Sequence, residues 1–577
     1  MKNINYFICL LVCCSSFVFT ACSDDDNSDT TNDSGVWDAP LRGSIATDET
    51  VDEPAVILGT LPAELSDAFN TRLTNVTNTV GDGTKILVVP CSELSAFTTD
   101  IVTVYENNGI IVIASPEPSV ANGWFEQMGL SYELPDDSVA KELFAFNKHH
   151  QYILDAPYEG ITRNEHLNHF VDWANDVLDT FSAVDPESGE SAIDKLVDAQ
   201  TITHTFGYKL EVVEAKAILS KPDKITGNGT FTAKYSIYAL YAFENQPSNG
   251  DYYIVNAEYT AHNATMCPVD ESTHRWTSKH GGVYCMLCGF YMTKFGVETS
   301  LCDKENSTTT IGEFPTGYTP SPQTTQGSTS YTSGMNWGFG GDATFGMDTK
   351  GPSGSVTVKG NLSFSNSQTR NIADVDILNQ SNASAAKYVY VVNNLPEAEK
   401  SHVTTPPLVS VSNATLFGSW IWRVPTTKNG SKDEFWLCTN LSDIEFGSCH
   451  LYSTALDFVS HTNRPDISNR KAYSKIIPPN RVPTGLLKIS NTNEGQYISD
   501  IVITNEQGQV EYTTKGKGSI PFNDAFLRYV PVGKYTIEFK MGSNNQSLKN
   551  YVLATGPIEI DVAEEYGLNS AFDFEKK

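Results

Sequence analysis

The stretch YTSGMNWGFGGDATFGM, residues 331–347, alternates between two kinds of residue. Every apolar or aromatic side chain lies at an odd position, and every even position carries glycine or a polar residue. Because successive side chains of a strand point to opposite faces, this period of two predicts one long strand with an apolar face and a polar face.

A second alternating strand follows the turn-rich segment 348–354, and its sequence is SVTVKGNLSFSNS, residues 355–367. One antiparallel register matches apolar with apolar side chains and acid with base, as cross-strand pairs do when they specify alignment. The pairs that it predicts are Phe345 with Val356, Ala343 with Val358, Phe339 with Leu362, Trp337 with Phe364 and, on the polar face, Asp342 with Lys359. Residues 331–366 are therefore expected to form a hairpin.

This hairpin has two interpretations. A hairpin packed on a core alternates in the same way, whereas in a transmembrane barrel the apolar face meets lipid and the polar face lines water. Seventeen residues at ~3.3 Å each span roughly 56 Å, which exceeds the ~25 Å apolar band of a barrel even when the strand is tilted. The many glycines suit a segment that adopts two conformations. One hairpin cannot close a barrel, so several chains would each contribute one.

The hairpin resembles the stem of the haemolysin and leukocidin family of β-barrel pore-forming toxins, with an aromatic and Gly-rich first strand, a tip with Gly and Pro, and a Ser-rich return strand. The flanking segments 233–259, KYVYVVNN and FGSWIWRVP resemble the β-sandwich around that stem. The resemblance covers residues 205–480. It implies a soluble monomer that assembles into a homo-oligomer on a lipid membrane and inserts one hairpin per protomer. It assigns the lumen to Asp342 and Lys359, and the lipid-facing surface to Trp337, Phe339, Ala343, Phe345, Met347, Val356, Val358, Leu362 and Phe364.

The N-terminus is typical of an export signal, with Lys2 before the apolar run YFICLLVCCSSFVF. The sequence FTAC, residues 19–22, resembles a bacterial lipobox, which predicts a signal peptide over 1–22 and a lipid on Cys22. The acidic tether 23–36 resembles the surface-export signal of Bacteroidetes lipoproteins, so we expect an outer-membrane or cell-surface location; a periplasmic lipoprotein is the alternative. Because toxins of this family are released, an anchored chain would leave its cell only by proteolysis or on vesicles.

The remaining sequence predicts a mainly β protein with three folded parts. Residues 37–200 combine a helical stripe in EHLNHFVDWANDVLDTF with the apolar strands KILVVP and GIIVIAS, which indicates a small α/β domain before the core. After the proline-rich link IIPPNRVPTG, residues 485–577 are expected to form a second, smaller β-sandwich. The 39 basic and 69 acidic residues give a net charge of -30, which argues against a nucleic-acid partner.

The cysteines admit two interpretations. Cys267, Cys285, Cys288 and Cys302 have zinc-knuckle-like spacing, but two disulfides satisfy the same pattern and are favoured outside the cytosol. Cys438 and Cys449 are predicted to bridge a hairpin, and Cys91 is expected to lie in a core. The pair His166 and His169 could ligate a metal, although a solvated helix face is favoured.

Motifs for catalysis are missing from the sequence: it has no nucleophile elbow, phosphate-binding glycine loop or helical zinc-protease motif. We therefore expect no enzymatic activity, no catalytic residue and no cofactor beyond a structural zinc at the cysteines. The alternative to a pore former is a non-toxic surface lipoprotein that binds a glycan or protein through its β domains. Trp420 and Trp422 fit a membrane rim or a core, and the core is favoured.

Overall fold

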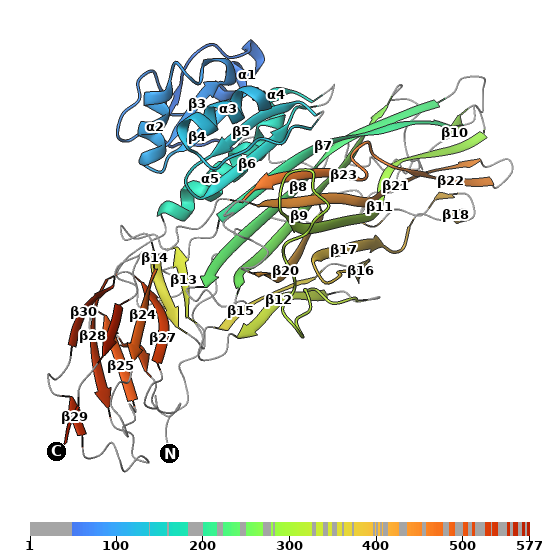
Figure 1. Cartoon of the computed structure of the whole chain (residues 1–577). Coiled ribbons are helices and arrows are strands. Elements are labelled where there is room, and N and C mark those ends of the chain that lie inside the picture. Colours follow the sequence, from blue (N-terminus) through green and yellow to red (C-terminus); the bar gives the residue numbers. More distant parts are fainter. Residues whose placement is uncertain are drawn as a thin grey trace, which may run out of the picture.

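The computed structural model of the chain confirms a mainly β protein (Figure 1). Residues 1–48, with the predicted signal peptide, Cys22 and the acidic tether, lie outside the described residues. The described residues are 49–137, 139–157, 161–182, 200–215, 223–242, 250–268, 279–280, 283–325, 330–338, 344–348, 355–359, 363–371, 374–395, 398–399, 402–403, 407, 414–425, 435–452, 457–476, 484–490, 500–505, 510–513, 525–531, 533–540, 551–553, 558–562, 568–571 and 574–576.

The N-terminal part is an α/β sheet covered by helices. Its strands run in the order β2-β1-β3-β4-β5-β6. Every residue of β3 and β4 is buried, as the two apolar runs of the sequence predict. The strands are β1 (Ala55–Ile57), β2 (Val76–Thr77), β3 (Ile86–Pro90), β4 (Ile110–Ala114), β5 (Lys141–Phe146) and β6 (His150–Asp155).

Helices form a separate core on each face of this sheet. Phe69 of α1 (Ala63–Arg72) and Phe170 of α5 (Asn168–Ser182) belong to one core. Ile101 of α2 (Thr98–Glu106) and Phe125 of α3 (Pro118–Met128) belong to the other. The short helix α4 (Arg163–His166) begins with a capping box between Thr162 and Glu165, which fixes the entry of the chain into α5.

The sheet continues without a break into the β-sandwich. Strand β6 pairs in parallel with β7 (Gln200–Ala215), and β7 pairs with β8 (Asp223–Ala242). Beyond β8 lie β9 (Gly250–Pro268) and β20 (Ala414–Pro425). The ladder between β6 and β7 therefore crosses the boundary predicted between residues 200 and 205.

A second sheet packs against β7, β8, β9 and β20. Its main path is β16-β17-β11-β21-β22, with β10 and β23 joined to it. The strands are β10 (Lys279–His280), β11 (Val283–Cys302), β16 (Val375–Asn379), β17 (Ala385–Val392), β21 (Trp436–Tyr452), β22 (Asp457–Asn463) and β23 (Arg470–Lys475). Trp420 and Trp422 are fully buried between the sheets, which confirms that they belong to the core.

Besides the two-stranded sheet of β29 (Tyr551–Leu553) and β32 (Phe574–Lys576), the described C-terminal part forms two larger sheets, which agrees with the predicted second sandwich. One sheet has the order β27-β24-β31 and the other β26-β25-β28-β30. These strands are β24 (Thr484–Ser490), β25 (Asp500–Asn505), β26 (Val510–Thr513), β27 (Ala525–Pro531), β28 (Gly533–Lys540), β30 (Ile558–Val562) and β31 (Leu568–Ala571). Within the described parts of the chain, no helix has the length and apolar character to cross a membrane.

Candidate functional site

The predicted stem is present as two stacked pieces of one hairpin. At its base, β12 (Ser330–Gly338) pairs antiparallel with β15 (Ser363–Asn371). Toward its tip, β13 (Thr344–Asp348) pairs antiparallel with β14 (Ser355–Lys359). In Figure 1, β12 and β15 are drawn along the lower side of the core sandwich, and β13 and β14 at the end of that sandwich nearest the C-terminal strands. The predicted residues Phe339, Asp342, Ala343 and Leu362 lie outside the described residues.

The register of the stem is as predicted at the base and shifted at the tip. Trp337 pairs with Phe364, as expected. The predicted pairing of Phe345 with Val356 is wrong, because Phe345 pairs with Val358 and Met347 pairs with Val356. Likewise, Thr344 pairs with Lys359 in place of the predicted Asp342.

The shift has a simple cause in chain length. Five residues, 339–343, separate the two pieces on the first strand, whereas three residues, 360–362, separate them on the return strand. The tip register is therefore displaced by two residues. Because side chains alternate with a period of two, a shift of two keeps every side chain on its original face. The hairpin thus keeps one apolar and one polar face in the corrected register.

The tip of the stem docks on the edge of the large sheet. Strand β8 pairs with β9 as far as Leu240, and its next two residues, Tyr241 and Ala242, pair with Gly346 and Phe345 of β13. The tip is held to the sandwich backbone by this two-residue ladder. The pairing of β13 with its own hairpin partner β14 is longer and extends over all of Thr344–Asp348. Leaving β8 would thus break few backbone hydrogen bonds and keep the hairpin intact.

Two segments lead into and out of the stem, 314–325 and 374–383, and we call them the stem roots. Thr325 and Ile377 tie the roots to each other by exchanging backbone hydrogen bonds of 2.9 and 3.1 Å. Ser321 and Ser419 of β20 exchange bonds of 2.8 and 2.9 Å. The Tyr388 hydroxyl donates to the Ser321 carbonyl at 2.6 Å. Both roots are therefore fixed to the sandwich, and any movement of the hairpin must begin beyond them.

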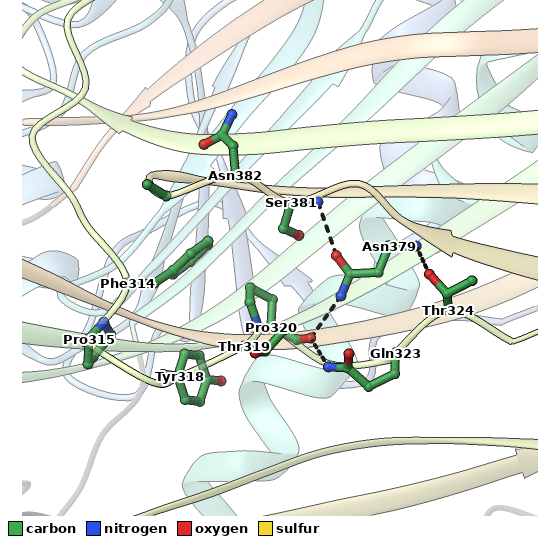
Figure 2. Close-up of a pocket in the computed structure, with 11 residues that line it drawn as sticks. Phe314, Pro315, Tyr318, Thr319, Pro320, Gln323, Thr324, Asn379, Ser381 and Asn382 are labelled. Carbon is green, nitrogen blue, oxygen red and sulfur yellow. Dashed lines mark hydrogen bonds between the residues drawn. The ribbon is translucent and has the colours of Figure 1, made fainter.

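A pocket lies between the stem roots (Figure 2). Its volume is about 520 Å³, which is in the range of small-molecule sites. Its lining residues are Phe314, Pro315, Tyr318, Thr319, Pro320, Gln323, Thr324, Asn379, Ser381, Asn382 and Ala383. No motif in the sequence pointed to this pocket, because its walls are far apart along the chain and the stem separates them.

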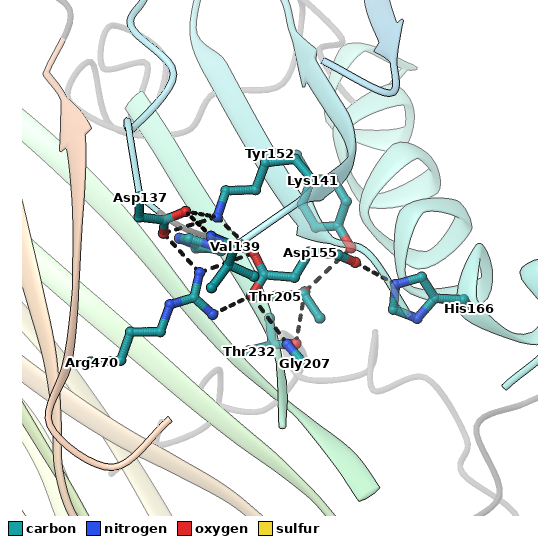
Figure 3. A network of polar contacts seen from close by, with 11 residues as sticks. Asp137, Val139, Lys141, Tyr152, Asp155, His166, Thr205, Gly207, Thr232 and Arg470 are labelled. Carbon is teal, nitrogen blue, oxygen red and sulfur yellow. Dashed lines mark hydrogen bonds and ion pairs between the residues drawn. The ribbon is translucent and has the colours of Figure 1, made fainter. Parts of the chain in front are cut away.

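A buried ionic network joins the α/β sheet to the sandwich (Figure 3). Asp155, at the end of β6, is fully buried. Its carboxylate accepts hydrogen bonds from Arg470 of β23 at 2.5 Å, from Lys141 at 3.0 Å and from the Gly207 backbone at 3.2 Å. Asp137 adds a second carboxylate to Lys141 and Arg470, at 2.7 and 2.8 Å.

The electrostatics keep Asp155 ionised. Burial alone would raise the pKa of Asp155, but the hydrogen bond from His204 and the positive charges of Lys141 and Arg470 hold it well below its usual range. The same two cations outweigh burial at Asp137 and lower the pKa of that carboxyl as well. The network is therefore a fixed set of charges at physiological pH, and its geometry suits a structural clamp between β6 and β23.

The variant Arg470→Ala tests this clamp. We expect a loss of about 3 kcal/mol in the free energy of unfolding, because removing one partner leaves buried carboxylates undercompensated. Urea unfolding followed by circular dichroism measures the change. Arg464→Ala is the matched control, since Arg464 pairs with Glu445 on the surface and its side chain is 70% exposed; we expect at most ~1 kcal/mol there. Equal losses in the two variants would contradict the clamp.

The prediction of a solvated His166 and His169 is wrong. Both side chains are buried. His166 Nε2 lies 2.6 Å from the Asp155 carbonyl, and His169 Nε2 lies 3.1 Å from the Thr230 hydroxyl. His166 is the last residue of α4, and His169 lies in the first turn of α5, whose apolar stripe faces the sheet. The two histidines pack at the margin of this stripe against β6 and β8. They bond separate partners and thus act in packing.

Burial makes His166 a source of acid sensitivity. Burial lowers the pKa of His166 to about 4, below the ordinary value of ~6.5 in an unfolded chain. Between these values the unfolded chain binds a proton that the folded chain does not, so stability falls as pH falls. Between pH 7 and pH 5, His166 alone should lower the free energy of unfolding by about 2 kcal/mol. Asp172, whose pKa burial raises to about 7, acts in the opposite direction over this range, because the folded chain binds its proton. The contribution of His166 is therefore a difference between two chains: urea unfolding at both pH values should show the free energy of unfolding changing by about 2 kcal/mol more favourably toward pH 5 in His166→Gln than in the parent. An identical change in the two chains would place the titration elsewhere.

Two cysteine predictions are corrected by the strands that carry them. Strand β11 runs from Val283 to Cys302, so Cys288 and Cys302 lie ~46 Å apart along one strand, and a single cluster of all four cysteines is wrong. Cys438 and Cys449 lie on one strand, β21, so they cannot bridge a hairpin. A structural zinc among the cysteines with zinc-knuckle-like spacing stays a prediction. Cys91 is buried, as predicted, and burial raises the pKa of its thiol.

The register brings other cysteines together. Cys288 and Cys449 are direct cross-strand partners on β11 and β21. Near the other end of the same strands, Cys302 and Cys438 are both free thiols in one buried cluster, and the hydrogen bond between them lowers the pKa of Cys302 to about 7.

We expect oxidised glutathione to join Cys302 to Cys438, with both protons and two electrons leaving the thiols. Peptide mapping by mass spectrometry should then give a cross-linked peptide 2 Da lighter than the sum of its reduced parts. Cys91 should remain a thiol in the folded chain and serves as the internal control. A cross-link between Cys438 and Cys449 would contradict the register.

Comparison with known proteins gives partial similarities only. No protein-family model and no curated protein matches the chain. Among solved structures, a pore forming protein matches at TM-score 0.24 and 11% identity, over 48% of this chain and 90% of that one. The delta-toxin of Clostridium perfringens matches at TM-score 0.24 and 14% identity, over 46% of this chain and 86% of that one. The major pilin SpaD of Corynebacterium diphtheriae matches at TM-score 0.21 and 9% identity, over 68% of this chain and 94% of that one.

These neighbours therefore include a pore forming protein, a toxin and a pilin. Since each TM-score is below 0.5, the similarities carry no argument about function. The function has to be inferred from the residues of the chain itself.

Proposed function

We propose that the chain is a pore-forming-toxin-like protein that oligomerises on a target membrane and inserts the hairpin 331–366. The observation that carries the proposal is the stem itself. It is a hairpin with one apolar and one polar face, paired along both of its described pieces, and within the described residues its tip pairs with β8 through Phe345 and Gly346. Such a hairpin can leave the sandwich as a unit and supply two strands to a closed barrel.

The energetics support release of the stem. The tip ladder on β8 is two residues long, and each net hydrogen bond contributes only ~1 kcal/mol. By contrast, the roots are fixed by the exchanged bonds at Thr325 and Ser321. Among the described residues, the tip is joined to the sandwich by a short backbone ladder, whereas the second root contains β16, which pairs with β17 over all of Val375–Asn379. A hairpin that swings out and stays attached requires such an arrangement.

The same proposal gives the chain a lipid anchor on Cys22 and a surface location. Its support is the export signal and the acidic tether of the sequence. Metabolic labelling with a palmitate analogue tests it, with Cys22→Ser as the unlabelled control. Labelling that persists in Cys22→Ser would contradict the assignment.

Dye release from liposomes tests the pore. The purified chain that lacks residues 1–22 is added to vesicles with a self-quenched dye, and leakage is expected to rise steeply with protein concentration, because several chains must meet in one ring. Vesicles with and without host-cell lipid extract control for a lipid receptor. Binding without leakage on every vesicle, also after limited proteolysis, would contradict a pore.

That outcome favours the alternative, a surface protein that binds a glycan or protein and never inserts its stem. The observation behind this alternative is the same ladder, since β13 in its folded position completes the edge of the large sheet. A stem that stays there permanently is an ordinary packed hairpin.

A further inference from the structure

The pocket between the stem roots has an unusual lining for its size. None of its eleven lining residues carries a charge. Two aromatic rings, Phe314 and Tyr318, lie with their centroids 6.4 Å apart and their planes tilted by 56°. The other polar groups are amides, hydroxyls and backbone carbonyls (Figure 2). The lining thus offers aromatic surface and neutral hydrogen-bonding groups together.

We propose that this pocket binds an uncharged saccharide. A sugar ring presents C–H groups that pack on aromatic faces and hydroxyls that bond to amides and hydroxyls, which matches both halves of the lining. An ionic ligand such as a phosphate or carboxylate would enter without a counter-charge, which is costly. A purely apolar ligand such as an acyl chain would offer no hydrogen-bond partner to the amide nitrogen of Asn382.

The pocket is preformed because its walls are bonded to each other. The Asn379 amide nitrogen donates to the carbonyls of Pro320 and Pro322 at 2.8 and 2.9 Å. The Asn379 oxygen accepts from the Ser381 backbone at 3.0 Å. On the other side, the Phe314 backbone N–H donates to the Ala383 carbonyl at 2.9 Å. Asn379 is therefore a positioning residue, and a ligand meets walls that need little ordering.

Tyr318 and Asn382 are held in place as well. The Tyr318 backbone N–H donates to the Pro315 carbonyl at 3.0 Å. Burial raises the pKa of the Tyr318 hydroxyl, so this ring is a neutral surface. The Asn382 oxygen accepts from the backbones of Ser384 and Ala385 at 2.9 and 2.8 Å. Its amide nitrogen adds a donor at the pocket.

Saccharide binding here does not depend on pore formation, but a sugar on the target surface would place the stem roots against that surface.

A glycan array probed with the labelled chain lacking residues 1–22 tests the site, followed by calorimetry with the best neutral mono- or disaccharide. Phe314→Leu removes aromatic surface and should weaken binding roughly 3- to 10-fold. Asn382→Asp keeps the oxygen that caps the turn but replaces the donor with a charge, and should weaken binding at least about 10-fold. Asn70→Asp makes the same change at an exposed position of helix α1 and should leave affinity unchanged. Thermal unfolding checks that all variants fold.

The outcomes separate this site from the pore. Neutral saccharides that bind the parent and lose affinity in both pocket variants support the site, whether or not the parent releases dye. Preference for sialylated, sulfated or phosphorylated glycans would overturn it. Affinity that is unchanged in Phe314→Leu and Asn382→Asp, with both variants folded, would overturn it too, and so would binding to no saccharide on the array.

Discussion

A chain that carries Ala242→Cys and Phe345→Cys is expected to release no dye while oxidised and to regain at least half of the parent's leakage after reduction. Residues 242 and 345 are direct partners in the antiparallel ladder between β8 and β13. Such partners have Cα atoms ~4.5–5.5 Å apart, within the range that a disulfide spans. The bond would fix the stem tip to the sandwich, and cysteine remains compatible with a lipid-facing position once the bond is reduced.

The control places the same bond where no movement is expected. Ser236 of β8 and Asn256 of β9 are also direct partners, and both strands belong to the fixed sandwich. Ser236→Cys with Asn256→Cys should leak like the parent in both redox states. The variant with Ala242→Cys and Phe345→Cys is first checked by mass spectrometry for its disulfide bond and then tested for leakage. If it leaks while oxidised, the stem does not have to leave β8 and the pore proposal is wrong.

The second large effect is expected from a charge on the lipid face. Phe345→Asp should reduce dye release at least about 10-fold. Each protomer of the ring would carry one carboxylate into the apolar band of the bilayer, and the free-energy cost of burying these carboxylates adds up over the protomers. Thr344→Asp is the matched control, since Thr344 is the neighbouring residue on the opposite face. There the carboxylate would face water, and leakage should be close to that of the parent.

Binding to liposomes, measured by sedimentation, should be equal for the two variants, which separates insertion from attachment. Equal leakage by both variants would show that the two faces of the stem are not distinguished by lipid. Loss of leakage only in Thr344→Asp would reverse the assignment of the faces.

Local patterns predicted the parts of the fold that depend on local sequence. The alternation from Tyr331 to Met347 predicted a hairpin with two faces, and the apolar runs predicted β3 and β4. The aromatic pair Trp337 and Phe364 fixed the register at the base. Toward the tip, glycines supply no side chains to pair, so register is weakly specified there and the unequal strand lengths decided it.

Features that join distant segments left no signal in the sequence. Arg470 and Asp155 are 315 residues apart, and each looks like an ordinary surface charge until β6 and β23 meet. The cysteine spacing resembled a zinc knuckle because nothing local shows that β11 continues through Cys285 and Cys288 to Cys302. The pocket was missed for the same reason, since the stem separates its two walls.

The ladder between β6 and β7 has a consequence for proteolysis. Because residues 150–154 of β6 cover residues 201–205 of β7, the α/β part shields a strand edge of the sandwich. A protease that removed this part would leave those backbone donors and acceptors without partners, and a bare edge readily pairs with a strand of another molecule. Removal of the N-terminal part would therefore do more than shorten the protein. It would expose the unpaired edge of β7 on each copy, and a strand of a second copy could pair with that edge.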